Sequence, residues 1–181
     1  MRKMLRMAIG VALAATPAAV LVTATPALAQ GTGSTPTTFT VETGELEISV
    51  PAAASLGLAP LGSASISGKL GDVEVIDSRG SASGSWVTTV SSTAFVTGSG
   101  AGPETIPSSD VDYDAGSAVA TTGIGTFTPG TPGDLAAPIT AFSASAETGN
   151  TTVTWDPTIT VHLPSSVVAG TYLGTITHSV A

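Results

Sequence analysis

The sequence contains no cysteine, few cations and few aromatic residues, and each shortage excludes a class of function. Without cysteine there is no disulfide, no thiolate chemistry, no iron–sulfur cluster and no cysteine-based zinc site. Only five Lys and Arg residues stand against thirteen Asp and Glu residues, and the formal net charge is −8. Nucleic acids and anionic membrane surfaces are bound through clustered Lys and Arg, so neither is an expected partner. Two Trp and two Tyr residues are too few for the sugar platforms of a glycosidase cleft.

Residues 1–29 have the three parts of a secretory signal peptide. A basic segment (residues 2–6) precedes an apolar run (residues 8–22), and residues 27–29 form an A-x-A cleavage site. The apolar run is too short, and too broken by proline, for a membrane span of about 20 residues. We therefore expect a secreted, extracellular protein, cut before Gln30 and carrying no membrane anchor. An exported domain without disulfides fits bacterial export best.

The remaining sequence predicts one domain behind a short linker. Residues 30–36 are rich in Gly, Ser and Thr and predict a flexible linker. Residues 37–181 show short alternating segments separated by Gly/Pro-rich stretches, without a sustained helical period. This pattern predicts an all-β antiparallel β-sandwich, immunoglobulin-like in general architecture but without its disulfide. The expected core consists of Trp86, Trp155, the phenylalanines and the β-branched residues that face them.

The most informative stretch is residues 73–90. Apolar residues alternate in residues 73–77 and again in 85–90, which predicts two strands with Trp86 on an inner face. The Gly/Ser-rich residues between them predict a hairpin connection. Arg79 lies in that connection beside Asp77, which predicts an ion pair at a strand end, with a binding role as the alternative.

Other segments give expectations of the same kind. Phe39 and Val41 are expected to begin the first strand, which continues through residues 45–50. Residues 52–62 are apolar but contain Gly and Pro, which favours a packed loop. Residues 118–122 predict a short strand, and the Gly/Pro-rich residues 123–137 a loop.

The last third of the chain has the clearest alternation. Residues 158–163 predict a strand with Ile159, Val161 and Leu163 facing inward, and residues 164–170 predict a connection.

The sequence offers no arrangement of residues typical of an enzyme. In the glycine-flanked residues 80–84, Ala82 occupies the position of the nucleophile in a Gly-x-Ser-x-Gly motif. Alternation places His162 on the polar face of one predicted strand and His178 on the apolar face of another. Because the spacing selects no catalytic triad, we expect no enzymatic activity.

Asp110, Asp112 and Asp114 alternate along one predicted strand and are the only candidate metal ligands. The EF-hand pattern is absent because Gly116 falls at position seven and Thr121 at position twelve. A looser β-sandwich calcium site is one interpretation. The other is a solvated edge strand whose like charges discourage aggregation. No other cofactor is expected.

Two stretches resemble the WxL domain of bacterial cell-surface proteins. Residues 75–80 (Val-Ile-Asp-Ser-Arg-Gly), followed by Gly84-Ser85-Trp86, resemble its first half, and residues 170–180 resemble its C-terminal strand. The resemblance covers residues 39–181. It implies an exported, non-enzymatic, β-rich module that attaches non-covalently to the cell wall, with peptidoglycan as the expected polymer.

The motifs depart from the family pattern in three places. Thr88 replaces the Leu of the first Trp-x-Leu, and His178 and Val180 stand where the second Trp and Leu are expected. The residues that could contact the wall are therefore Trp86, His178 and Arg79, and Trp86 is equally well interpreted as a core residue. The sequence ends without a sorting motif or hydrophobic tail, which also favours non-covalent attachment.

The predicted function is a secreted, non-catalytic module that binds the cell wall, with other surface proteins as further expected partners. The first alternative is a secreted adhesin or assembly subunit that binds a protein partner through an edge strand or the Gly/Pro-rich loops. The second is a calcium-dependent carbohydrate binder.

Overall fold

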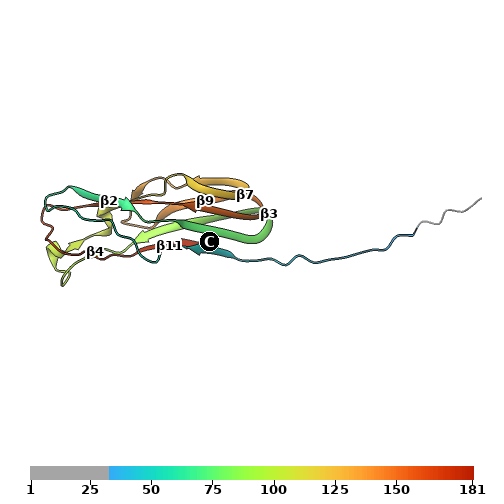
Figure 1. The fold of residues 1–181 in the computed structure, drawn as a ribbon, viewed down its shortest axis with the longest axis horizontal. Helices are drawn as coiled ribbons and strands as arrows, with labels where there is room; N and C mark the ends of the chain where they lie inside the picture. The colour runs from blue at the N-terminus through green and yellow to red at the C-terminus, as the bar shows by residue number, and fades with distance from the viewer. Residues whose placement is uncertain (1–32) are drawn as a thin grey trace, which may run out of the picture. The chain divides into compact units, whose positions relative to one another are not determined.

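The computed structural model describes residues 33–181, so the predicted signal peptide lies outside the described residues. Thr40–Ala181 forms one compact unit that contains all the strands (Figure 1). Among residues 33–181, no helix is long and apolar enough to cross a membrane. The elements are β1 (Leu46–Ser49), β2 (Ser65–Lys69), β3 (Val73–Ser92), β4 (Phe95–Val96), η1 (Gly102–Glu104), β5 (Thr105–Ile106), η2 (Ser108–Asp110), β6 (Val111–Asp114), β7 (Ala118–Pro129), β8 (Gly133–Asp134), β9 (Ile139–Trp155), β10 (Thr158–His162) and β11 (Ile176–Val180).

The strands form antiparallel sheets. The largest has the order β1-β3-β9-β7, and β11 also pairs with β3. A second sheet has the order β2-β10-β6-β8, and β4 and β5 form a small third sheet. The described residues contain no α-helix, and the two short η elements are single 3₁₀ turns. The prediction of an all-β antiparallel β-sandwich is confirmed.

Strand β9 folds back on itself, and this builds the two layers of the sandwich. Phe142 and Trp155 are thirteen residues apart, which would separate them by about 43 Å in a straight strand. Their rings stack with centroids 4.9 Å apart. The two halves of β9 therefore face each other across the core.

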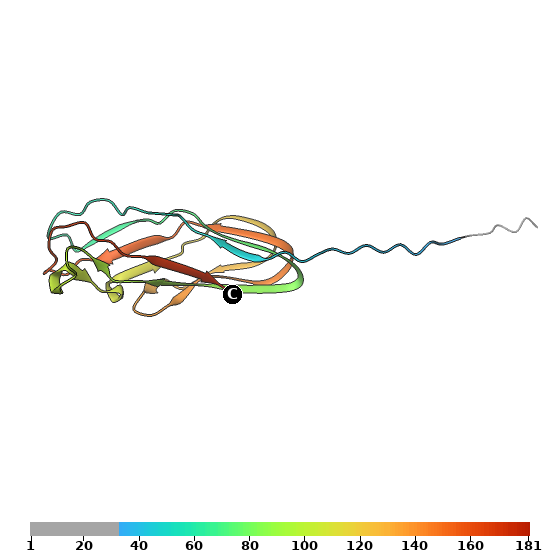
Figure 2. The same ribbon diagram turned by 90° about the horizontal axis from the view of Figure 1, so that it is seen from below.

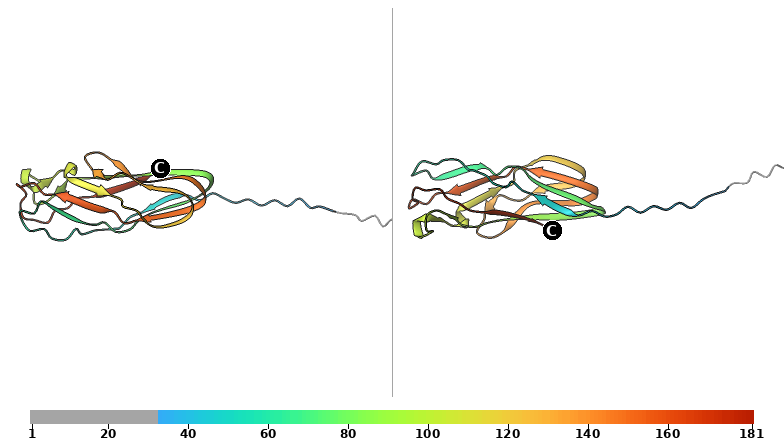
Figure 3. Two further views of the ribbon diagram at one scale, coloured as in Figure 1. Left: turned by 90° about the horizontal axis from the view of Figure 1, so that it is seen from above. Right: turned by 60° about the horizontal axis from the view of Figure 1, so that its bottom comes forward.

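Strands β3 and β7 bend at the same end of the sandwich as β9 (Figures 2 and 3). The pairing of β3 with β9 shifts register between Asp77 and Trp86, and that of β7 with β9 shifts around Gly123. Gly123 and Gly149 have φ angles of 86° and 74°. Such left-handed backbone favours glycine and lets a strand turn sharply. We call this the bend end of the sandwich.

Two sequence predictions are wrong because of these bends. Residues 73–77 and 85–90 do not form a hairpin: they are two halves of β3, and both pair with β9 rather than with each other. Residues 123–129, predicted as a loop, continue β7. In both places Gly and Ser permit a bend within a strand, whereas local sequence rules interpret them as a turn between strands.

The predicted start of the first strand is also wrong. Phe39 and Val41 are 88% and 81% exposed and belong to no strand, and β1 begins only at Leu46. The alternation that predicted a strand is present, but no neighbouring strand pairs with it. Residues 52–62 form a loop, as predicted.

The core lies between the two layers and contains both predicted tryptophans, but only one of the four phenylalanines, Phe142, is fully buried in it. Phe95 and Phe127 pack against the core partly buried, and Phe39 is exposed. Trp86, Trp155 and Phe142 are at most 2% exposed, and the predicted inward alternation of Ile159 and Val161 in β10 is confirmed. The buried apolar residues are Val73, Val75, Trp86, Val90, Ile106, Val111, Tyr113, Ala115, Leu135, Ala141, Phe142, Ala144, Val153, Trp155, Ile159 and Val161.

Candidate functional site

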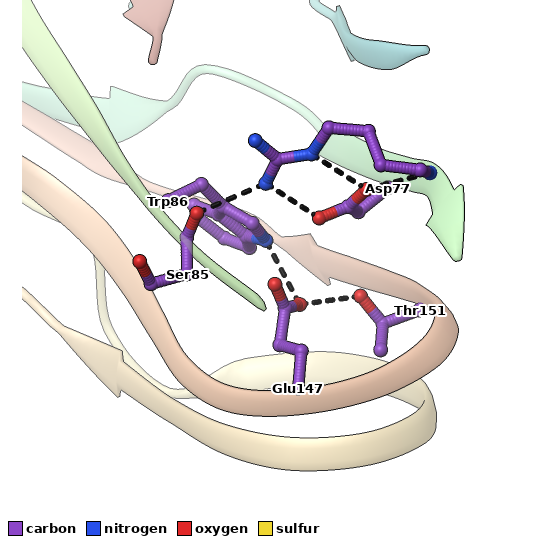
Figure 4. Close-up of polar contacts among 6 residues, drawn as sticks. Asp77, Ser85, Trp86, Glu147 and Thr151 are labelled. Carbon is purple, nitrogen blue, oxygen red and sulfur yellow. Dashed lines mark hydrogen bonds and ion pairs between the residues drawn. The ribbon is translucent and has the colours of Figure 1, made fainter. Parts of the chain in front are cut away.

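Trp86 lies at the bend end, inside the sandwich (Figure 4). Its indole Nε1 donates a hydrogen bond of 3.0 Å to Oε1 of Glu147, and the hydroxyl of Thr151 donates to the same oxygen. Glu147 is only 1% exposed, and its Oε2 has no hydrogen-bond partner among the described residues. Trp86 therefore joins the C-terminal half of β3 to the bend of β9.

Arg79 closes the same end from outside. Its guanidinium donates to both carboxylate oxygens of Asp77, at 3.0 and 2.7 Å, and also to the backbone carbonyl of Ser85. These hydrogen bonds hold the pKa of Asp77 below its usual value. The predicted ion pair is confirmed, and it spans the bend of β3.

His178 lies on β11 and reaches the other layer of the sandwich. Trp155 Nε1 donates to the hydroxyl oxygen of Tyr113 at 2.9 Å, which leaves the Tyr113 hydroxyl to donate to Nε2 of His178, 3.0 Å away. Burial lowers the pKa of His178 to about 4, so the ring is a neutral acceptor at pH 7. This chain of hydrogen bonds joins β9, β6 and β11.

The three candidates for contact with the wall thus have partners inside the protein. Trp86 is 2% exposed and cannot reach a polymer outside the folded chain. His178 accepts a hydrogen bond from Tyr113. Arg79 uses Nε and Nη2 for its bonds to Asp77 and Ser85, whereas Nη1 makes no hydrogen bond within the described residues and 38% of the side chain is accessible. Their positions assign all three a part in holding the sandwich together.

The structure does not bring the three candidate calcium ligands together. Asp110 lies in η2, and Asp114 accepts a hydrogen bond from the backbone N–H of Gly116. Asp112 pairs with His162 across β6 and β10, at 2.7 Å. Within residues 33–181, no group of three or more His, Cys, Asp or Glu side chains could hold a metal ion.

An apolar groove lies between two loops of the described part of the chain. It has a volume of about 610 Å³, and residues 54–61 and 167–174 form its two walls. Its floor is made by side chains that pack on or belong to the core: Ile66, Phe95, Ile106, Val161 and Leu163. We call this hollow the apolar groove.

The rim of the apolar groove carries exposed leucines. Leu58 is fully exposed, Leu61 is 72% exposed and Leu173 is 79% exposed. All the residues that line the groove are uncharged, in a chain with thirteen carboxylates. Exposed apolar surface that continues into a core is typical of a binding surface, because leaving it in water costs free energy.

The loop formed by residues 54–61 has free backbone groups. It follows the outer edge of β2, where the backbone of Leu56 lies against Gly68. Within the described residues, no backbone–backbone hydrogen bond involves residues 52–59, and β2 pairs only with β10. The loop therefore covers this edge of the sandwich by side-chain contact and leaves polar backbone groups for another chain.

The sequence predicted the loops but not the apolar groove. Residues 52–62 were identified as a packed apolar loop, and residues 164–170 as a connection. The signal that could have indicated a binding surface was the presence of three leucines in residues 52–62, because loops are usually polar. That these two loops lie side by side depends on tertiary packing.

Comparisons of the chain with protein-family models, with curated proteins and with solved structures gave no match.

Proposed function

We propose that this chain is a secreted, non-catalytic β-sandwich subunit of the bacterial cell surface that binds a protein segment in the apolar groove. The observation that carries the proposal is the groove itself, uncharged, open and floored by core residues. Export is supported by the signal-peptide pattern of residues 1–29.

The chemistry of the apolar groove favours a protein over a glycan. Sugars are bound by exposed aromatic faces together with side-chain hydrogen bonds. Here the single O–H of Tyr172 is shared between the backbone carbonyls of Pro103 and Val168, 3.2 and 3.1 Å away, and the rim is aliphatic. An extended peptide with apolar side chains would match both the leucine rim and the free backbone groups of residues 52–59.

Attachment to a wall polymer is the second candidate, and one observation favours it. The two motif positions of the WxL resemblance lie side by side, because Val180 pairs with Thr88 and His178 with Val90 in adjacent strands. The wall contact itself would have to use residues other than Trp86.

Sedimentation with two kinds of cell envelope separates the candidates. We expect the purified protein to pellet with envelopes that retain their surface proteins and to stay in the supernatant with protein-free sacculi. A double variant, Leu58→Asp with Leu173→Asp, should lose the binding. Val119→Asp with Ile124→Asp adds the same charge at exposed positions of β7, outside the groove, and should retain it.

Two results would contradict the proposal. If the protein pellets with protein-free sacculi at high salt, the polymer is the ligand. If the variant with Leu58→Asp and Leu173→Asp binds the protein-bearing envelopes as well as the unmodified protein does, the apolar groove is not the binding surface.

A further inference from the structure

Residues 33–41 precede the sandwich in sequence and contain a strand-like segment that pairs with no strand of the described residues. Phe39 and Val41 alternate with Thr38 and Thr40, so the two apolar side chains would share one face of a strand. Both apolar side chains are more than four-fifths exposed. Thr, Phe and Val are also the residues that strands prefer. We call residues 38–41 the donor segment.

The donor segment and the apolar groove both lack charged side chains. Residues 33–41 contain no charged side chain, and the first carboxylate follows at Glu42. The groove is likewise uncharged. Two copies of this acidic chain repel each other, and these two regions can come into contact without desolvating a charge.

The donor segment is too short to reach the groove of its own chain. The backbone N–H of Gly44 donates to the carbonyl of Ser78, at the bend end. Val41 precedes Gly44 by three residues, or about 10 Å of chain, and Phe39 by five, or about 17 Å. β2 and β3 run in line along β10 and β9, because Lys69 pairs with Thr158 and Val73 with Trp155. The ten residues from Ser78 to Gly68, which lies against the groove loop, therefore span roughly 30 Å. An occupant with these side chains must come from another molecule.

We propose that the apolar groove binds the donor segment of a second copy of this chain, so that copies assemble head to tail. Phe39 and Val41 would enter the groove against its leucine rim, and the segment's backbone would bond to free groups of residues 52–59. Because donor and acceptor surfaces differ, each added copy presents a new groove, and the assembly stays open-ended. This inference rests on the proposed function and names its partner.

The test measures mass by light scattering and sedimentation, on protein expressed from the full-length sequence. We expect oligomers that grow with protein concentration, and growth that increases with salt because screening reduces the repulsion between acidic copies. A donor variant, Phe39→Asp with Val41→Asp, should associate at least about a hundredfold more weakly, because two buried apolar side chains are replaced by charges. Thr38→Asp with Thr40→Asp is the matched control, with the same charge on the opposite face, and should still form oligomers.

Mixing two defective variants is the sharpest test. The donor variant keeps its groove, and the groove variant (Leu58→Asp with Leu173→Asp) keeps its donor segment. Each alone should be monomeric, and an equal mixture should form one-to-one pairs and nothing larger. All four substituted positions are highly exposed, so the circular dichroism of the variants should match that of the unmodified protein.

The inference is overturned if the unmodified protein is monomeric at its highest soluble concentration, or if oligomers persist in the donor variant. If either result is obtained but the groove variant still loses envelope binding, the proposed function holds, because the groove then binds a different protein. If the groove variant retains envelope binding, the proposed function itself fails.

Discussion

At the scale of single residues, buried polar atoms hold the two layers in one arrangement. Trp86, Glu147 and Thr151 form one such cluster, and Trp155, Tyr113 and His178 another. Each indole combines a large apolar area with one N–H that must find an acceptor when buried. The two tryptophans therefore specify which halves of the folded strands face each other.

Replacing Trp86 tests its role in the core. Trp86→Ala should lower the free energy of unfolding by about 3–5 kcal/mol, because it leaves a large cavity. Trp86→Phe keeps most of the packing but removes one donor to Glu147, and should cost about 1–3 kcal/mol. Denaturant titration measures both costs. Val87→Ala, at the exposed neighbouring residue, is the control and should change the free energy of unfolding only slightly. Unchanged stability combined with lost envelope binding would instead make Trp86 a surface contact.

His178 should make the stability of the protein depend on pH. Its folded-state pKa is about 4, below its ordinary value of 6.5, so the unfolded chain binds the proton more readily. The contribution of neutral His178 to the free energy of unfolding is complete above pH 6.5. It decreases by about 3 kcal/mol as the pH falls from 6.5 to about 4.

The variant His178→Gln isolates this contribution from other titrating groups. Gln can still accept from the Tyr113 hydroxyl but does not titrate. The stability difference between the protein and the variant, measured by denaturant titration at pH 7 and pH 4.5, should therefore shrink at the lower pH. His162→Gln, at an exposed histidine, serves as the comparison. Parallel pH profiles for the protein and the His178 variant would refute the assignment.

At the scale of elements, three long strands bend together at one end. Strand-forming residues continue through the bends of β3, β7 and β9, and glycines occur where the register shifts. Each strand thereby contributes to both layers, so one continuous sheet replaces several separate hairpins. This explains why local turn signals predicted connections where the structure has strand.

Two glycine substitutions test the bends. Gly149 has a positive φ with open space around it, so Gly149→Ala should cost about 1–2 kcal/mol from backbone strain alone. At Gly123 an added Cβ would also lie close to the backbone carbonyl of Asn150, so Gly123→Ala should cost more. Thermal or denaturant unfolding measures how much stability each substitution removes and which of the two removes more. Equal costs would show that the contact with Asn150 adds nothing to the backbone strain, and no cost at either position would show that the bends do not require glycine.

At the scale of the whole molecule, one end of the sandwich is closed and the other is open. The bend end is closed by strand bends and by the pair of Arg79 with Asp77. The open end is covered by residues 54–61 and 167–174, which leave the apolar groove between them. In the proposed function, specificity would depend on the shape and length of that groove.

Calcium should leave the stability of this fold unchanged. Asp112 already pairs with His162, and Asp110 and Asp114 lie in other local arrangements, so no three carboxylates converge. We expect the same melting temperature with millimolar calcium as with EDTA, measured by calorimetry. A rise with calcium that disappears in Asp112→Asn would establish a site on β6 and would favour the carbohydrate-binding alternative.

The sequence by itself determined the class of fold and the inner faces of its strands. Alternation with a period of two placed Trp86, Ile159 and Val161 correctly, because side-chain direction in a strand depends only on the residue's position. The ion pair of Arg79 with Asp77 was also predictable, since the two lie two residues apart. These features are local, and local sequence carries them.

Only the tertiary structure decided which segments meet. Whether a Gly/Ser-rich stretch ends a strand or bends it depends on the neighbouring strand, and for β3 that neighbour is β9, about sixty residues away in sequence. Likewise, Phe39 and Val41 alternate as a strand does, yet no strand of their own chain pairs with them. The apolar groove joins loops a hundred residues apart, because burying the core from both layers brings their ends together.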